Sequence, residues 1–434
     1  PAVPVLDSLP IPPGAAVFEQ LKGKWDADER RFSGFYPRLQ RPVGAPATAE
    51  HRVPTTAEPL LGGFFLNNAH GENIYEAAAR HGIDPAKITD FSASINPLGL
   101  SPRAKKKLGK EGLAAVLRYP DTQCRDLRRA LAEYHSIPAE TTLPGAGSTE
   151  FIYSLPRLLD FKKVLLVTPA SSEYENALEA QNPDCRIHFF ETREEDGFEL
   201  SVGGLLLALT QGYDALFLCN PNNPTGILTE KKDLLRVLAR TEREKTWFIL
   251  DEAFVDFVPG ETLLREAVFS TRLITLRSLS HFFAMPGLRT GYMVSNPEVI
   301  RKIQEKKEPW GLNSLAQFMA SESLRDMAYV DRTLAYIQEE RENLILGLRG
   351  IPGFIPYPGS ANYLLVQLHP SLDLTAADLR ERLIPRGILI HDCRSFHHIG
   401  PYFFRVAVRT RKENHLLLKA LGQVHKQMVK PGKG

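Results

Sequence analysis

Short apolar runs that alternate with amphipathic segments between residues 163 and 279 constrain the fold more than any other feature of this chain. The runs KVLLVT, ALFLC, WFIL and RLITL are mainly apolar, and segments such as KKDLLRVLARTE lie between them. Strands that are apolar on both faces are typical of parallel sheets with helices on both sides. The sequence therefore predicts an α/β fold built on a mostly parallel sheet.

The composition divides the chain into parts with different expected roles. The first 66 residues are rich in proline, which predicts an extension with little regular structure. The remaining residues show helix and strand patterns throughout. We expect an extension at 1–66, an arm at 67–100, a large domain at 101–298, a linking helix at 299–325 interrupted near Pro309, and a small α+β domain at 326–434.

Charge and cysteine content exclude several classes of function. The 434 residues include 53 basic and 51 acidic ones, so a net charge of +2 favours neither nucleic acid nor a membrane surface. The four cysteines lie far apart and lack the spacing of a metal site, as expected of thiols in a reducing cytoplasm. No apolar run reaches the length of a membrane span. We expect a cytoplasmic protein with small-molecule ligands, no metal site and no nucleic-acid partner.

The stretch LRSLSHFFAMPGLRTGYMV, residues 276–294, is the leading candidate for a ligand-binding loop. A predicted strand leads into it, an apolar run leads out, and Pro-Gly forces a bend between them. Arg277, Ser278, Ser280 and Arg289 crowd this turn. Hydroxyls, backbone N–H groups and guanidinium forks all donate hydrogen bonds to anions. The stretch therefore predicts an anion site.

Two other turns carry polar groups at the ends of predicted elements. Gly147, Ser148 and Thr149 open a predicted helix, whose first N–H groups favour a phosphate, although an ordinary capped helix uses the same residues. In CNPNNPTG, two prolines and a glycine fix a polar loop that contains Asn223. This loop follows a strand, and ligands bind at the carboxyl ends of strands in open α/β sheets.

Charged residues on two further predicted strands complete the candidate site. Asp251 ends the apolar run in ILDEAFVDF, where a buried carboxylate needs a partner. Its place between the asparagine loop and the arginine loop favours a cofactor contact over a helix cap. In FFRVAVRT, Arg405 and Arg409 share one face if the strand runs that far, and two such arginines can clamp a carboxylate. Scattered surface arginines are the alternative.

Together these motifs resemble the fold-type-I pyridoxal-phosphate enzymes over about residues 67–434. SLSHFFAMPGLRTGY resembles the lysine loop of that family. HGENI, DFSASINPLG and DEAFVDF are similar to the histidinol-phosphate aminotransferase group, most closely to its L-threonine-O-3-phosphate decarboxylases. The resemblance implies a seven-stranded sheet in the large domain, pyridoxal 5'-phosphate, and a homodimer with a shared active site. It implies decarboxylation of L-threonine O-3-phosphate to aminopropanol phosphate for cobalamin side chains; a histidinol-phosphate-type aminotransferase is the alternative.

The resemblance also implies a role for each candidate residue. Asn223 contacts the phenolic oxygen of the cofactor, Asp251 pairs with its ring nitrogen, and Tyr119 reaches the cofactor phosphate of the other subunit. The other residues implied in cofactor binding are Gly147, Ser148, Thr149, Ser278, Ser280 and Arg289, and those implied in substrate binding are His70, Asn96, Arg405 and Arg409.

Two positions depart from the family pattern. His281 stands where the family has the lysine that forms a Schiff base, and no lysine lies between Lys245 and Lys302. Ser171 stands where the family stacks an aromatic ring on the cofactor, a loss of about 1 kcal/mol. Since imidazole forms no stable Schiff base, the cofactor is expected to bind non-covalently. Three hypotheses follow: a slow decarboxylase, a non-catalytic or regulatory subunit, and an enzyme in which His281 is the acid or base of a reaction without a Schiff base.

Overall fold

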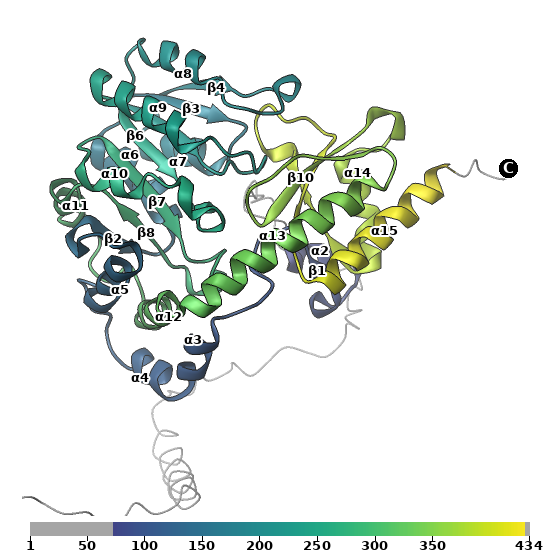
Figure 1. Ribbon diagram of the computed structural model, residues 1–434, viewed down its shortest axis with the longest axis horizontal. Coiled ribbons are helices and arrows are strands. Elements are labelled where there is room, and N and C mark those ends of the chain that lie inside the picture. The colour runs from purple at the N-terminus through teal and green to yellow at the C-terminus, as the bar shows by residue number, and fades with distance from the viewer. Residues whose placement is uncertain (1–72, 430–434) are drawn as a thin grey trace, which may run out of the picture. The chain divides into compact units, whose positions relative to one another are not determined.

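The computed structural model describes residues 73–429, coloured in Figure 1. The predicted extension at 1–66 and His70 lie outside these residues. The predicted boundary between a large and a small domain stays a prediction.

Seven strands form the central sheet in the order β2-β8-β7-β6-β5-β3-β4. All run parallel except β8, which is antiparallel to both of its neighbours. The prediction of a mostly parallel seven-stranded sheet is therefore confirmed. The strands are β2 (Thr142–Gly145), β3 (Lys163–Thr168), β4 (Arg186–Glu191), β5 (Ala215–Cys219), β6 (Trp247–Asp251), β7 (Leu273–Ser278) and β8 (Gly291–Val294).

The strand β2 has no counterpart in the sequence prediction, which places a turn and a helix there. Its four residues include Pro144, which has no N–H group to donate to a neighbouring strand. The structure accommodates the proline because β2 is at the edge of the sheet, where only β8 pairs with it.

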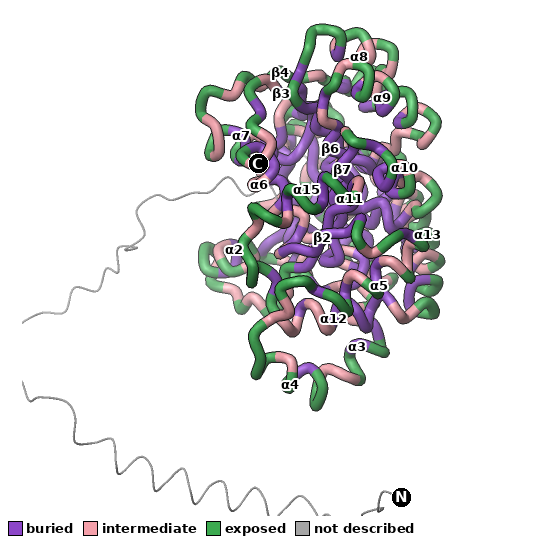
Figure 2. Tube along the Cα trace, turned by 90° about the vertical axis from the view of Figure 1, so that its left-hand side faces the viewer, coloured by how far each residue is buried: buried purple, intermediate pink, exposed green. Residues whose placement is uncertain are grey.

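Alternate residues of the central strands enter two separate cores, one on each face of the sheet. Ile249 and Leu276 pack on the face covered by α6, α7 and α11, whereas Leu250 and Leu273 pack on the face covered by α5, α8, α9, α10 and α12. Figure 2 shows the buried strands between these helices. The helices are α5 (Arg125–His135), α6 (Ser148–Leu159), α7 (Glu173–Gln181), α8 (Val202–Leu209), α9 (Lys231–Glu244), α10 (Leu264–Phe269), α11 (Pro297–Gln304) and α12 (Ser314–Leu324).

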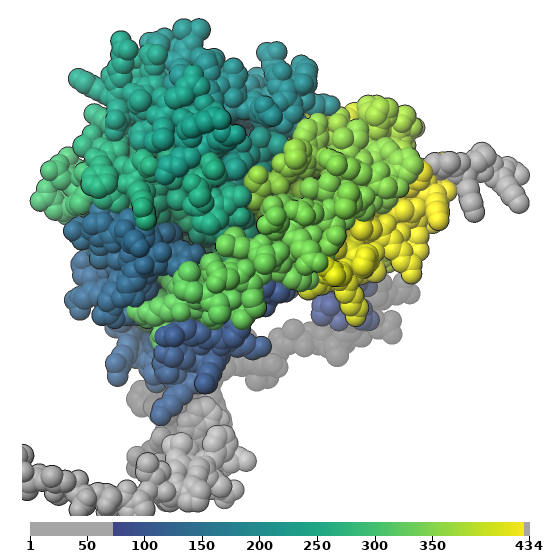
Figure 3. All heavy atoms as spheres, viewed as in Figure 1, coloured from purple at the N-terminus to yellow at the C-terminus, as the bar shows by residue number. Residues whose placement is uncertain are grey.

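The predicted linking helix at 299–325 is two helices, α11 and α12. Residues 305–313 separate them and include Pro309, which cannot donate a hydrogen bond within a helix. The long connecting element is instead α13 (Met327–Arg349), which crosses the face seen in Figures 1 and 3 toward the carboxyl-terminal elements. The break between α11 and α12 includes Pro309, near which the sequence predicts an interruption.

A second, antiparallel sheet in the order β12-β13-β10-β9 packs with α13. A short parallel pair, β1 and β11, joins residues from opposite ends of the chain. The remaining elements are α2 (Ile74–His81), β1 (Thr89–Asp90), α3 (Pro102–Lys107), α4 (Leu113–Val116), β9 (Phe354–Pro356), β10 (Tyr363–Leu368), α14 (Ala376–Leu383), β11 (Ile388–Leu389), β12 (His391–Asp392), β13 (Phe403–Ala407) and α15 (Arg411–Val429).

A buried group of three charges lies behind the ends of β6 and β7. Arg277 is 1% exposed and pairs with Glu252, at 3.2 Å, and with Asp256. Burial alone would lower the pKa of Arg277, but Asp256 first, and then Tyr292 and Glu252, carry it above its ordinary value. The prediction that Arg277 belongs to the anion loop is thus wrong, because strand alternation turns its side chain to the opposite face of the sheet.

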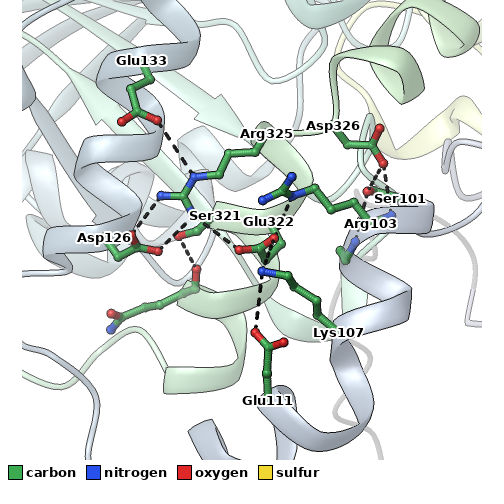
Figure 4. Close-up of polar contacts among 12 residues, drawn as sticks. Ser101, Arg103, Lys107, Glu111, Asp126, Glu133, Ser321, Glu322, Arg325 and Asp326 are labelled. Carbon is green, nitrogen blue, oxygen red and sulfur yellow. Dashed lines mark hydrogen bonds and ion pairs between the residues drawn. The ribbon is translucent and has the colours of Figure 1, made fainter.

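A second group of charges lies where α3, α5 and α12 meet, as Figure 4 shows. Arg325 pairs with Asp126 at 2.9 Å and with Glu322 at 3.4 Å. Glu322 also pairs with Arg103 and Lys107, at 2.7 Å and 3.2 Å. These cations are partly exposed, so each pair contributes little to stability compared with the buried group.

Within residues 73–429, no helix has the length and apolar character needed to cross a membrane.

Candidate functional site

A cavity of about 370 Å³ lies where β5, β6 and β7 end. This is the edge at which open α/β sheets bind their ligands. The loop after β7 and the start of α6 close other sides of the cavity. Its lining residues are Ala93, Ser94, Ile95, Ser148, Thr149, Ile152, Ser171, Tyr174, Cys219, Asn223, Asp251, Ala253, Phe254, Ser278, Ser280, His281, Pro286, Arg289 and Arg405. Ten residues named from the sequence therefore surround one cavity.

The start of α6 forms one end of the cavity and faces Arg289. Gly147 has a φ of +87°, and a Cβ atom there would lie 2.9 Å from a terminal nitrogen of Arg289. Ser148 and Thr149 follow in the first turn of the helix, where free N–H groups and the helix dipole attract an anion. Across the cavity, the buried hydroxyl of Ser280 has no hydrogen-bond partner among residues 73–429. This end of the cavity has the donors that a phosphate requires.

Gly291 keeps the two halves of this anion site together. An added Cβ atom would lie 2.5 Å from the Ser148 nitrogen, 2.6 Å from the Gly147 carbonyl carbon and 2.7 Å from the Arg277 oxygen, which are all backbone atoms. We expect Gly291→Ala to lower the free energy of unfolding by about 1–3 kcal/mol, since the backbone must move. Denaturant titration measures this change. Gly287→Ala is the matched control, because its Cβ would meet open space; equal losses in both variants would refute the packing argument.

Asp251 is a buried carboxylate without a cation among its described hydrogen-bond partners. The hydroxyl of Tyr174 donates to its Oδ2 at 2.7 Å, and the Ala253 N–H donates to its Oδ1 at 2.9 Å. Burial raises the pKa of Asp251 above the ordinary value for aspartate, although these two hydrogen bonds act in the opposite direction. A cationic group of a ligand would remove this imbalance, so the floor of the cavity favours a protonated nitrogen.

Arg405 presents the opposite imbalance on another wall. It is 3% exposed, and its guanidinium donates to the side-chain oxygen of Asn223 and to the Ser92 carbonyl, at 2.9 Å for the latter. Its Nε has no partner among the described residues, and burial lowers the pKa of Arg405. Among the described residues, Arg405 donates hydrogen bonds to neutral oxygens and lies over the ring of Tyr363, so it suits a carboxylate ligand.

His281, predicted to stand at the position of the family's lysine, lines the cavity. Its Nδ1 lies 3.0 Å from the Ser94 carbonyl oxygen, and its ring packs on Phe254 with centroids 4.3 Å apart. No lysine lines the cavity among the described residues. Ser171, at the predicted stacking position, also faces the cavity.

Two residues predicted to bind substrate make hydrogen bonds within the protein. The amide nitrogen of Asn96 donates to the Phe282 carbonyl at 2.8 Å and to the Tyr329 hydroxyl at 2.9 Å, inside the core. Arg409 donates to the Asp90 carbonyl at 2.9 Å, away from the cavity. The pattern of alternation does not reach Arg409, because β13 ends at Ala407. Neither residue lines the cavity, and a substrate contact by either residue stays a prediction.

The other predictions about loops lie beyond what this chain alone tests. Tyr119 is 87% exposed and its ring lies 5.9 Å from that of Trp310, outside the cavity. Its predicted contact is with another subunit and stays a prediction. The predicted role of His70 lies outside the described residues.

The sequence prediction missed several residues that line the cavity. Tyr174 and Ser94 are both buried, and the sequence analysis assigns neither of them a role in the site. Cys219 and Phe254 are apolar neighbours of named motifs and gave no separate chemical signal. The spacing of Tyr174 gives a signal of its own. Tyr174 lies three residues after Ser171, so one turn of the chain brings both side chains toward the same site.

The described residues fit a cofactor with a phosphate, a basic ring nitrogen and a carboxylate-bearing partner. The start of α6 with Arg289 suits the phosphate, Asp251 suits the nitrogen, and Arg405 suits the carboxylate. No lysine lines the cavity among the described residues, so this lining offers no amine for covalent attachment.

Comparisons with known proteins agree with this geometry. The model of a family described as aminotransferase class I and II matches residues 86–421. The threonine-phosphate decarboxylase of Salmonella typhimurium is 39% identical over 361 residues, which are 83% of this chain and 97% of that protein. The crystal structure of the histidinol-phosphate aminotransferase from Clostridium acetobutylicum is 29% identical, with a TM-score of 0.73 over 78% of this chain and 100% of its own.

A further structure shows the same fold with a ligand. The histidinol-phosphate aminotransferase from Sinorhizobium meliloti, solved in complex with pyridoxal-5'-phosphate, has a TM-score of 0.74 at 20% identity, over 82% of this chain and 95% of its own. The matches extend over most of the chain and confirm the resemblance inferred from the motifs. This chain therefore belongs to the class I and II aminotransferase family.

Proposed function

We propose that this protein binds pyridoxal 5'-phosphate non-covalently and decarboxylates L-threonine O-3-phosphate to aminopropanol phosphate. The observation that carries the proposal is one cavity in which a helix start, a buried carboxylate and a buried guanidinium converge. These groups complement the phosphate and ring nitrogen of the cofactor and the carboxylate of an amino acid. The relative named for this decarboxylation, at 39% identity, supports the choice of substrate.

When bound, the cofactor supplies an electron-withdrawing ring that stabilises negative charge on the carbon of its partner. Asp251 then holds the ring nitrogen in its protonated state. Arg405 orients the substrate carboxylate, with Asn223 fixing one of its nitrogens. Arg289 and the start of α6 hold the phosphate. The buried walls formed by Phe254 and Tyr174 exclude water from the reacting groups.

The absence of a lysine from the described lining of the cavity favours a second candidate, a non-catalytic subunit that binds the same ligands. Such a protein retains Asp251, Arg289 and Arg405 but has no group for covalent attachment. A homodimer is part of both proposals, with Tyr119 of one subunit reaching the cofactor phosphate of the other; its exposure in the single chain is consistent with that role.

Cofactor titration of the wild type beside His281→Lys tests the proposal. We expect pyridoxal phosphate to bind the wild type saturably and reversibly, so that dialysis removes the cofactor. The lysine variant should instead retain the cofactor after borohydride reduction, as a mass increment on the peptide that contains residue 281. Failure of both variants to bind the cofactor would refute the proposed function.

Turnover separates the two candidates and the two substrate classes. Carbon dioxide release from threonine phosphate by the wild type supports the decarboxylase, and release by His281→Lys alone supports a non-catalytic native protein. Amino-group transfer from histidinol phosphate, in place of decarboxylation, would identify an aminotransferase. Phe269→Leu is a suitable control, since Phe269 is 81% exposed and does not line the cavity.

A further inference from the structure

A backbone carbonyl holds the ring of His281 at its Nδ1 atom. Its Nδ1 lies 3.0 Å from the Ser94 oxygen. A carbonyl oxygen only accepts hydrogen bonds, so Nδ1 must carry the hydrogen. In the neutral ring the lone pair is then on Nε2, and any gain or loss of a proton takes place at that atom.

A second layer of contacts fixes the carbonyl and the ring. The Ser94 oxygen also accepts a hydrogen bond from the side-chain nitrogen of Asn362, at 2.9 Å, and Asn362 is completely buried. The Asn96 N–H donates to the carbonyl of His281 at 2.9 Å. Phe254 packs on the ring and is itself in contact with Tyr363, with centroids 4.9 Å apart. The orientation of the imidazole is therefore set by neighbours on three different segments.

These contacts resemble the way enzymes prepare a histidine for proton transfer. One ring nitrogen is held by an acceptor, which selects the tautomer, and the other is left as the site of proton exchange. In this protein, the histidine lines the cavity in which the charged groups converge. A histidine that only filled the space of a lysine would need neither the carbonyl nor the buried amide behind it.

We propose that His281 transfers a proton to the bound ligand through Nε2, and that Ser94 and Asn362 are the residues that position it. This inference rests on the proposed function. In decarboxylation, the bond between the carbon and its carboxylate breaks, and carbon dioxide leaves. The electron pair left on the carbon takes the proton from Nε2 of the cationic ring. The neutral ring recovers a proton from water, while Nδ1–H stays on the Ser94 carbonyl throughout.

The tautomer is measurable without any ligand or turnover. Nitrogen-15 correlation spectra of protein labelled at histidine, assigned with His281→Gln, report which ring nitrogen carries the hydrogen at a pH where the ring is neutral. We expect a protonated Nδ1 in the wild type. In Asn362→Leu, which removes the second donor to Ser94, we expect a mixture of tautomers. A wild-type ring protonated at Nε2 would overturn the proposal.

The variant His281→Asn separates proton transfer from structural support. The amide of His281→Asn takes the place of Nδ1–H and keeps the donor to Ser94, but nothing takes the place of Nε2. We expect this variant to bind pyridoxal phosphate within about threefold of the wild type, since the hydrogen bond to the Ser94 carbonyl remains. It should lose at least about 100-fold in carbon dioxide release, the usual size of a general acid–base contribution.

The outcomes also distinguish this proposal from the proposed function. Wild-type protein that binds no pyridoxal phosphate refutes the proposed function, whatever the tautomer. Wild-type protein that binds the cofactor and threonine phosphate, but neither releases carbon dioxide nor exchanges the substrate's carbon-bound hydrogen with deuterium oxide, refutes proton transfer alone. Full activity in His281→Asn does the same. For Asn362→Leu, kcat should fall more than KM rises, because Asn362 does not touch the cavity.

Discussion

Replacing Arg277 with methionine should lower the free energy of unfolding by about 3–5 kcal/mol, because it leaves two buried carboxylates without a cation. Glu252 is fully buried and Asp256 is 4% exposed. Burial already raises the pKa of both acids, and the charge of Arg277 is the largest effect that opposes it. Urea titration at neutral pH measures the loss.

Two further variants show whether the unpaired charge is the cause. Arg325→Met is the surface control, since Arg325 is partly exposed and its partner Glu322 keeps Arg103 and Lys107, as in Figure 4; we expect a loss below about 1 kcal/mol. Combining Arg277→Met with Glu252→Gln and Asp256→Asn should recover part of the stability, since no charge is then left buried. A triple variant that is less stable than Arg277→Met would contradict this account.

Asp251→Asn should have opposite effects on stability and on ligand binding. The neutral amide removes a buried charge that has no cation among the described residues, so we expect the ligand-free protein to gain about 0.5–2 kcal/mol at neutral pH. The same change removes the charge that holds a protonated ring nitrogen, and pyridoxal phosphate should bind about 10- to 100-fold more weakly, as expected for loss of a charge-assisted hydrogen bond.

The stability gain should depend on pH in a definite direction. Burial raises the pKa of Asp251 in the folded protein above its value in the unfolded chain, so folding favours the protonated acid. The free energy of unfolding of the wild type therefore falls as the pH rises from the pKa of Asp251 in the unfolded chain to its pKa in the folded protein. The stability advantage of Asp251→Asn grows over the same pH range. Thermal unfolding at several pH values measures it. An advantage that is largest in acid would show that Asp251 is stabilised in its ionised form.

The sequence predicted the central sheet and much of the cavity for identifiable reasons. Apolar runs that alternate with amphipathic helices are typical of an internal parallel sheet, and the carboxyl ends of such strands meet at one edge. Motifs that follow β5, β6 and β7 therefore had to converge, as Asn223, Asp251 and Ser278 do. Here, local patterns and the topology of the sheet carry the same information.

Other features depended on contacts that a sequence pattern does not encode. Because β13 ends at Ala407, Arg409 lies beyond the strand, where it contacts Asp90 and Glu413. Asn96 stands in a polar loop, but its partners lie on α13 and in the loop after β7. Strand length and long-range hydrogen bonding determine both outcomes, and neither is local.

The alternation at the ends of β6 and β7 also bears on the fidelity of folding. Asp251 and Ser278 face the cavity, while their neighbours Glu252 and Arg277 face the core behind it. A slip of one residue in either strand would exchange the two faces. It would leave a charge alone in the apolar core, so the misaligned state would be strongly disfavoured. The buried ion pair thus disfavours misaligned strands during folding. Although it lies on the opposite face of the sheet, it helps to fix the arrangement of the site.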